Sequence, residues 1–185
     1  MDETDNADDH GSFEIISGLT IRAIRLIRAI RVCNSCLEFV SYIRIMRIAI
    51  INGPNLNLLG KRETDIYGNE SFDAYFLKLK DKFKAVELTS FQSNVEGELI
   101  NEIQRVGFEY DGIVLNPGGY THTSVAVGDA VAAIIAPVVE VHISNIFGRE
   151  EFRKLSHVSG KAVGVISGLG LQGYDLAIRF LTGQI

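Results

Sequence analysis

The chain has 185 residues, of which 46% are hydrophobic, and a formal net charge of -5. This length suits one domain with or without an extension, and the hydrophobic fraction suits a packed globular core. The negative charge argues against a protein that coats nucleic-acid duplexes, although it allows a locally basic pocket for a small anion. No uncharged apolar run approaches the roughly 20 residues that span a bilayer, so we expect no membrane partner.

The first 45 residues differ in composition from the rest. Residues 1–18 are acidic and polar, which is typical of a disordered tail and unlike a secretory or mitochondrial leader, so we expect a cytoplasmic protein. Residues 21–32 carry an arginine at every third position. That repeat fits either a basic amphipathic helix that binds an anionic membrane or a partner, or a segment outside the working domain, translated from an upstream start. We favour the second interpretation, because Met46 lies two residues before the first predicted strand.

From Met46 onward, short apolar runs rich in β-branched residues alternate with segments of helical periodicity. The pattern predicts strands at 48–52, 86–91, 112–115, 138–143 and 162–166, and helices at 71–83, 95–106, 122–135, 150–155 and 173–181. Ser71 and Asn94 are the expected caps of the first two helices. This alternation predicts an α/β fold: a flavodoxin-like, doubly wound, five-stranded parallel sheet in the order 2-1-3-4-5. We therefore predict an N-terminal extension at 1–45 and a catalytic domain at 46–185.

In that strand order the topological switch point lies between the first and third strands. These are the strands followed by the two Asn-Pro-Gly-type loops, at 52–55 and 116–119, and the fourth strand ends beside them. Ligands of doubly wound sheets bind at this point. We also expect the start of the third helix, at 121–124, to direct free backbone N–H groups into the crevice, where they suit a carboxylate or phosphate.

Glu140 and His142 lie two positions apart in the fourth strand, so their side chains face the same way. A carboxylate beside an imidazole fixes its tautomer and makes it a usable proton donor near neutral pH. The alternative is an ordinary solvated strand end.

Tyr67 and Arg62 share the loop after the first strand. A tyrosine with its usual pKa near 10 is a weak base at pH 7, but a neighbouring guanidinium can lower that pKa. The alternative is a structural tyrosine beside an arginine.

Other polar residues surround the same crevice. His122 is a helix cap or a substrate contact, and Asn116 supplies an amide close to a small ligand. Asp129 is typical of a surface group at an oligomer boundary. Arg149 and Arg153 share a helix face, where like charges repel unless an anion lies between them; pairing with the intervening glutamates is the alternative.

Neither the cysteines nor the glycine-rich C-terminal segment predicts a cofactor site. Cys33 and Cys36 lack a second pair or nearby histidines, so we expect incidental thiols, and no metal cluster is evident. Gly168-Leu-Gly170-Leu-Gln-Gly173 follows the last strand, with no later strand for a ribose-binding acid, and predicts a tight turn rather than a dinucleotide site.

Together these motifs resemble type II 3-dehydroquinate dehydratase. The resemblance rests on Asn52-Gly-Pro-Asn-Leu-Asn-Leu-Leu-Gly60 with Arg62 and Tyr67-Gly68, Gln92-Ser-Asn94, Asn116-Pro-Gly-Gly-Tyr-Thr-His-Thr-Ser124, Glu140-Val-His-Ile-Ser-Asn145, Arg149-Glu-Glu-Phe-Arg153 and residues 168–174. They occur in family order from Met46 to the end. Gly128, inside the third helix, is a departure that costs about 1 kcal/mol of helix propensity.

The resemblance implies a cofactor-free anti elimination of water from 3-dehydroquinate, giving 3-dehydroshikimate in the shikimate pathway of aromatic amino acid biosynthesis. Tyr67 would remove the proton next to the ketone, with its pKa lowered by Arg62. Asn55, through a bound water, would stabilise the enolate. His142, oriented by Glu140, would protonate the departing hydroxyl.

The resemblance also implies how the substrate is held and how the protein assembles. Asn116, His122, Arg153 and the backbone of Ile143 and Ser144 would bind the hydroxyls and carboxylate. Asp129 matches a position that reaches a neighbouring subunit's site, in dodecamers built from trimers. The competing hypothesis is a non-catalytic small-anion-binding or scaffold module on the same fold.

Overall fold

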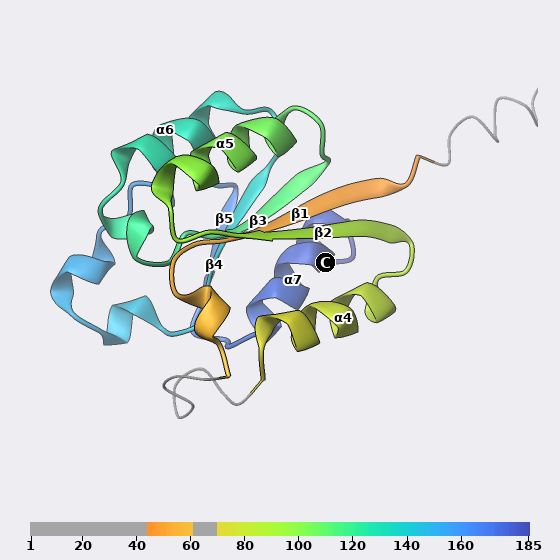
Figure 1. Ribbon diagram of the computed structural model, residues 1–185, viewed down its shortest axis with the longest axis horizontal. Helices are drawn as coiled ribbons and strands as arrows, with labels where there is room; N and C mark the ends of the chain where they lie inside the picture. Colours follow the sequence, from red (N-terminus) through yellow and green to blue (C-terminus); the bar gives the residue numbers. More distant parts are fainter. Residues whose placement is uncertain (1–43, 61–69) are drawn as a thin grey trace, which may run out of the picture. The chain divides into compact units, whose positions relative to one another are not determined.

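The computed structural model describes residues 44–60 and 70–185 of the chain (Figure 1). Residues 45–185 form a compact unit around one five-stranded parallel sheet. Its strands are β1 (Met46–Asn52), β2 (Val86–Gln92), β3 (Gly112–Asn116), β4 (Val138–His142) and β5 (Gly164–Ser167). The order β2-β1-β3-β4-β5 confirms the predicted flavodoxin-like topology.

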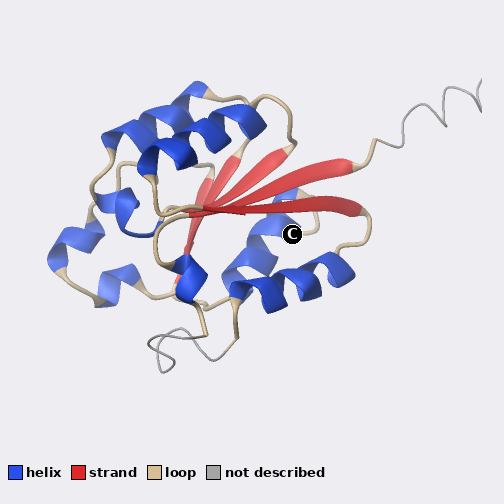
Figure 2. Ribbon diagram, viewed as in Figure 1, coloured by secondary structure: helices blue, strands red, loops and turns tan. Residues whose placement is uncertain are grey.

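Helices cover both faces of the sheet (Figure 2). They are α4 (Phe72–Lys82), α5 (Glu96–Gly107), α6 (Val125–Ala133) and α7 (Gln172–Leu181), with four 3₁₀ helices η1 (Leu56–Leu58), η2 (Gly118–His122), η3 (Ile146–Gly148) and η4 (Glu151–Lys154). Alternate residues of β1 point to opposite faces. Ile48 and Ile50 belong to the core under α4 and α7, whereas Ala49 and Ile51 belong to the core under α5 and α6. Every helix in the described ranges is too short or too polar to cross a membrane.

The predicted start of the third helix is wrong. The segment divides into η2 and α6, with Ser124 capping α6 by accepting a hydrogen bond from the backbone N–H of Val127 at 2.9 Å. The N–H groups of Thr123 and Ser124 both donate to the carbonyl of Tyr120, at 3.2 and 2.8 Å. Since a tight turn uses these groups, they are not directed at the crevice as expected.

The predicted cap at Asn94 is also wrong, whereas the cap at Ser71 is confirmed by a 3.2 Å bond from the Ala74 N–H to the Ser71 hydroxyl. The first helical residue after Asn94 is Glu96, and the Asn94 side-chain oxygen instead accepts the backbone N–H of Asn55 at 2.9 Å. The Asn94 side chain therefore links the loop after β1 to the loop after β2.

Near the C-terminus, β5 begins two residues later than predicted, because the N–H groups of Lys161 and Ala162 close a turn on Val158.

Candidate active site

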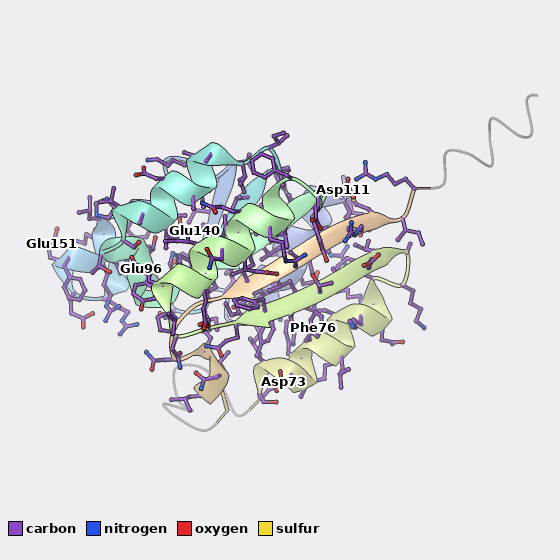
Figure 3. The ribbon with its side chains drawn as sticks, turned by 45° about the horizontal axis from the view of Figure 1, so that its top comes forward. Asp73, Phe76, Glu96, Asp111, Glu140 and Glu151 are labelled. Atoms are coloured by element: carbon purple, nitrogen blue, oxygen red, sulfur yellow. The ribbon has the colours of Figure 1, made fainter. Side chains whose placement is uncertain are left out.

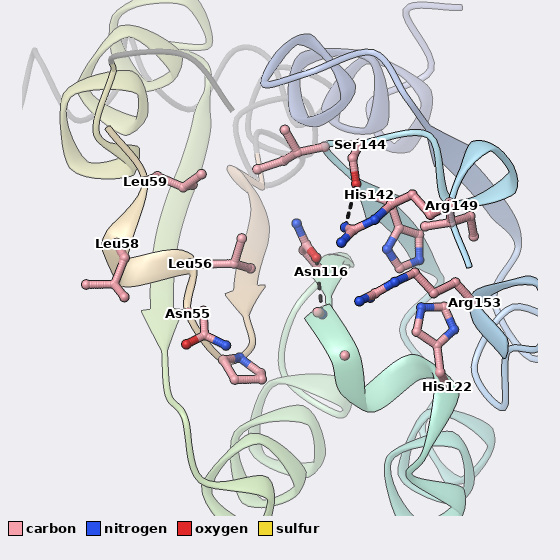
Figure 4. Close-up of a pocket in the computed structure, with 15 residues that line it drawn as sticks. Asn55, Leu56, Leu58, Leu59, Asn116, His122, His142, Ser144, Arg149 and Arg153 are labelled. Atoms are coloured by element: carbon pink, nitrogen blue, oxygen red, sulfur yellow. Dashed lines mark hydrogen bonds between the residues drawn. The ribbon is translucent and has the colours of Figure 1, made fainter. Parts of the chain in front are cut away.

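A pocket of about 220 Å³ lies at the carboxyl ends of β1, β3 and β4 (Figure 4). One wall comes from the loop after β1 and η1, and the opposite wall from the segments after β4, with Asn116 between them (Figure 4). The lining residues are Pro54, Asn55, Leu56, Leu58, Leu59, Asn116, Gly118, Gly119, His122, His142, Ile143, Ser144, Ile146, Arg149 and Arg153. The position agrees with the predicted switch-point crevice.

The two Asn-Pro-Gly-type loops meet beneath this pocket. The N–H of Gly53 donates to the Asn116 carbonyl at 2.7 Å, and a Cβ on Gly53 would lie 2.5 Å from the Pro117 carbonyl oxygen. Only glycine allows this approach. Asn55 follows with a φ of 67°, a left-handed conformation that asparagine tolerates better than most residues. The crossing loops thus fix Asn55 and Asn116 on adjacent sides of the cavity.

A buried tyrosine fixes the side chain of Asn116. The Asn116 amide nitrogen donates to the Tyr174 hydroxyl at 2.8 Å, and that hydroxyl donates to the Asn52 side-chain oxygen at 2.8 Å. The Asn116 oxygen accepts the N–H of Gly118 at 3.2 Å. Sequence patterns did not indicate this role for Tyr174, because it lies 58 positions from Asn116.

Glu140 and His142 face the same side of β4 and are in contact, as predicted. His142 Nε2 lies 2.8 Å from Glu140 Oε1, and the two residues are 5% and 0% exposed. Glu140 lies inside the molecule, whereas Glu151 projects from the surface (Figure 3). Burial alone raises the pKa of Glu140, but hydrogen bonds from His142, Ser159 and Thr121 outweigh it and hold that pKa below its ordinary value. The carboxylate is therefore ionised at neutral pH and accepts a hydrogen bond from His142 Nε2, so Nδ1 is the ring nitrogen that does not contact Glu140.

His122 is a pocket residue rather than a helix cap, since Ser124 caps α6. Its Nδ1 lies 2.7 Å from the carbonyl oxygen of Leu155, so Nδ1 carries the proton in this contact. Burial lowers the pKa of His122, and the nearby His142 and Arg153 lower it further. The ring is therefore neutral near pH 7, and its Nε2 can accept a hydrogen bond from a ligand hydroxyl.

Arg149 and Arg153 both line the pocket, and both also contact the carboxylate of Glu150, at 3.5 and 2.7 Å. The predicted shared helix face is wrong, because η4 begins at Glu151 and leaves Arg149 outside it. Arg149 donates to the Ser144 hydroxyl at 3.3 Å. Two guanidinium groups beside the backbone of Ile143 and Ser144 suit an anionic ligand.

Residues 46–182 match the family model described as dehydroquinase class II. The chain belongs to this family. A 3-dehydroquinate dehydratase of Fusobacterium nucleatum is 54% identical over 141 residues, which are 74% of this chain and 96% of that protein. One from an Exiguobacterium species is 52% identical over 137 residues, covering 74% and 94% of the two chains. The crystal structure of a type II dehydroquinase from Butyrivibrio crossotus has a TM-score of 0.70 and 47% identity, covering 74% of this chain and 97% of that one.

Four predicted site residues of this class II dehydroquinase do not line the pocket as described. Glu140 is fully buried behind His142 and reaches the pocket only through that residue. Tyr67 and Arg62 lie outside the described residues, as does the whole predicted extension up to residue 43. Asp129 is exposed on α6 and does not line the cavity of its own chain. The pocket also contains apolar residues that were not among the predicted site residues, namely Leu56, Leu58, Leu59 and Ile146. The apolar run Leu-Asn-Leu-Leu directly after Asn55 is the sequence feature that could have indicated the three leucines.

Proposed function

We propose that this protein is a 3-dehydroquinate dehydratase that removes water from 3-dehydroquinate by an anti elimination through an enolate. The observation that carries the proposal is the buried Glu140–His142 pair opening onto a pocket with two arginines, in a chain of the class II dehydroquinase family. The product is 3-dehydroshikimate, which places the reaction in the shikimate pathway of aromatic amino acid biosynthesis. No cofactor is needed, because a base and an acid suffice for this reaction.

In the proposed mechanism, Tyr67 as a tyrosinate takes the proton from the carbon next to the ketone, and Arg62 stabilises the tyrosinate. Asn55, through a bound water, stabilises the negative charge that develops on the enolate oxygen. The carbon–oxygen bond then breaks, and His142 acts as an imidazolium with protons on both ring nitrogens. It gives its Nδ1 proton to the departing hydroxide, which leaves as water, and the ring becomes neutral with its proton on Nε2. Glu140 holds the opposite nitrogen of the ring.

The remaining pocket residues hold the substrate in this proposal. His122 and Asn116 bind ring hydroxyls, because both present polar atoms with a fixed orientation. Arg153 and the backbone of Ile143 and Ser144 bind the carboxylate, where a guanidinium forms charge-assisted hydrogen bonds. Asp129, exposed on α6, reaches the site of a neighbouring subunit in a dodecamer built from trimers. We place the enzyme in the cytoplasm.

Incubating the purified full chain with 3-dehydroquinate should produce the ultraviolet absorbance of the conjugated product. The same assay on a shortened chain that begins at Met46 tests whether residues 46–185 are the catalytic domain. Absence of turnover in both proteins would contradict the proposal and favour a small-anion-binding or scaffold module.

The Tyr174→Phe variant should show a higher KM for 3-dehydroquinate and lower stability. Without the hydroxyl, the Asn116 amide nitrogen and the Asn52 oxygen lose a buried partner, which costs about 2 kcal/mol. Urea unfolding and steady-state kinetics measure the two effects. Tyr110→Phe is the matched control: this buried tyrosine bonds to Thr89 and two arginines away from the pocket, so it should lose stability with an unchanged KM. An unchanged KM in both variants would show that Tyr174 does not orient Asn116.

A further inference from the structure

We infer that Thr121 and Ser159 are positioning residues that hold the Glu140 carboxylate in one orientation and thereby keep the proton of neutral His142 on Nε2. The inference rests on the proposed function, in which His142 delivers a proton from Nδ1 into the pocket. Neither hydroxyl lines the pocket, so both would act through Glu140.

Both oxygens of Glu140 are occupied by donors. Oε1 accepts the Thr121 hydroxyl at 2.5 Å and His142 Nε2 at 2.8 Å, and Oε2 accepts the Ser159 hydroxyl. Thr121 and Glu140 are fully buried, so water cannot replace a lost donor without entering the core. An unpaired buried carboxylate oxygen is costly, and the three donors together define where the carboxylate lies.

The direction of these hydrogen bonds follows from a second contact of Thr121. Its hydroxyl also lies 2.7 Å from the Ser156 hydroxyl. Since Thr121 gives its only hydroxyl proton to Glu140, Ser156 must be the donor in that contact. The Ser156 oxygen in turn accepts the N–H groups of Val158 and Ser159, at 3.1 and 2.8 Å. Thr121, His142 and Ser159 therefore all donate to Glu140, and the carboxylate acts only as an acceptor.

The segment that carries Ser156 and Ser159 is itself fixed against η2 and α6. The N–H of His157 donates to the Thr121 carbonyl at 2.8 Å. A Cβ on Gly128 would lie 2.4 Å from the His157 carbonyl oxygen, so only glycine lets α6 approach this segment. This contact explains the glycine inside the helix, and it gives the Ser159 hydroxyl a defined distance from Glu140.

A carboxylate that only accepts hydrogen bonds selects one tautomer of neutral His142. Nε2 bears the proton, and Nδ1 is the atom whose protonation changes during the reaction. If a donor is lost, the carboxylate can rotate toward the remaining ones, and the imidazole loses its fixed partner. A misplacement of about 1 Å in such a group costs up to about 100-fold in rate.

The test compares Thr121→Val, which keeps the shape of the side chain, and Ser159→Ala with the unchanged full chain. We expect kcat to fall about 10- to 100-fold with KM nearly unchanged. Ser159→Thr restores a hydroxyl and should recover most of kcat. Thr89→Val, in β2 and away from the pocket, is the control for the same change of residue type. The Thr89 hydroxyl bonds to Tyr110, and kcat should stay at the wild-type value.

The outcomes separate this inference from the proposed function. If the full chain turns over 3-dehydroquinate and His142→Ala does not, while Thr121→Val and Ser159→Ala keep the wild-type kcat, the positioning role is wrong and the function stands. If His142→Ala keeps full activity, the proposed role of His142 fails. Neutron diffraction of the unchanged protein gives a check that needs no variant to fold: a deuteron on His142 Nε2 supports the inference, and one on either Glu140 oxygen overturns it.

Discussion

Replacing Tyr67 with phenylalanine should lower the turnover of 3-dehydroquinate by at least about 100-fold and leave its binding nearly unchanged, because a general base contributes that much to a proton abstraction. None of the tyrosines in the described part of the chain lines the pocket. Leu59, which does line it, lies just before the segment that carries Tyr67. Calorimetric titration with substrate and the absorbance assay measure binding and turnover separately.

Tyr75→Phe is the matched control for this variant. Tyr75 lies in α4 beside a groove shared with α7, away from the active-site pocket. Burial, with the nearby Asp175 and Glu70, raises its pKa to about 12, so it stays protonated at neutral pH and cannot act as a base. This variant should keep wild-type kcat. Full activity of Tyr67→Phe would show that the base has been assigned to the wrong residue.

The fold could be predicted from the sequence because its strongest signals are local. Apolar β-branched runs such as residues 48–51 became central strands, and periodic segments became the helices that cover them. The contact of Glu140 with His142 also followed from strand geometry alone, since residues two apart share a face. Both of these predictions depended on one local pattern and one simple rule.

The contacts that could not be predicted are those in which a polar side chain has a distant partner. Asn94 fits a helix cap by type and position, but it bonds to Asn55, which is 39 positions away. Tyr174 bonds to Asn52 across 122 positions, and Ser159 reaches Glu140 from a loop without a motif. Such contacts depend on how the strand ends and loops are arranged in space, which no window of the sequence contains. Gly128, unfavourable as a helix residue, is explained only by the carbonyl packed against it.

Glu140→Gln should both inactivate and destabilise the enzyme. A glutamine amide places an NH₂ group where His142, Thr121 or Ser159 also donates, so at least one buried donor loses its acceptor. Breaking a buried charged contact in this way costs about 3 kcal/mol. We expect kcat to fall about 100-fold or more, because the imidazole loses the group that orients it. Glu102→Gln, which removes a surface ion pair with Arg105, should change kcat little and stability by less than about 1 kcal/mol.

The pH dependence of the unfolding free energy gives a second test of the Glu140→Gln variant. The pKa of Glu140 in the folded protein is held below its ordinary value of 4.5 by His142, Ser159 and Thr121, despite burial. The unfolded chain therefore binds a proton first as the pH falls, and the stabilisation by the carboxylate is present above pH 4.5 and lost as the pH falls through the folded pKa. Asp175 and Glu150 also have lowered pKa values, but both proteins contain them, so their contributions cancel in the comparison. The difference in unfolding free energy between wild type and Glu140→Gln should narrow as the pH falls from 7 toward 3. A difference that stays constant over this range would mean that the carboxylate is not held ionised by its three donors.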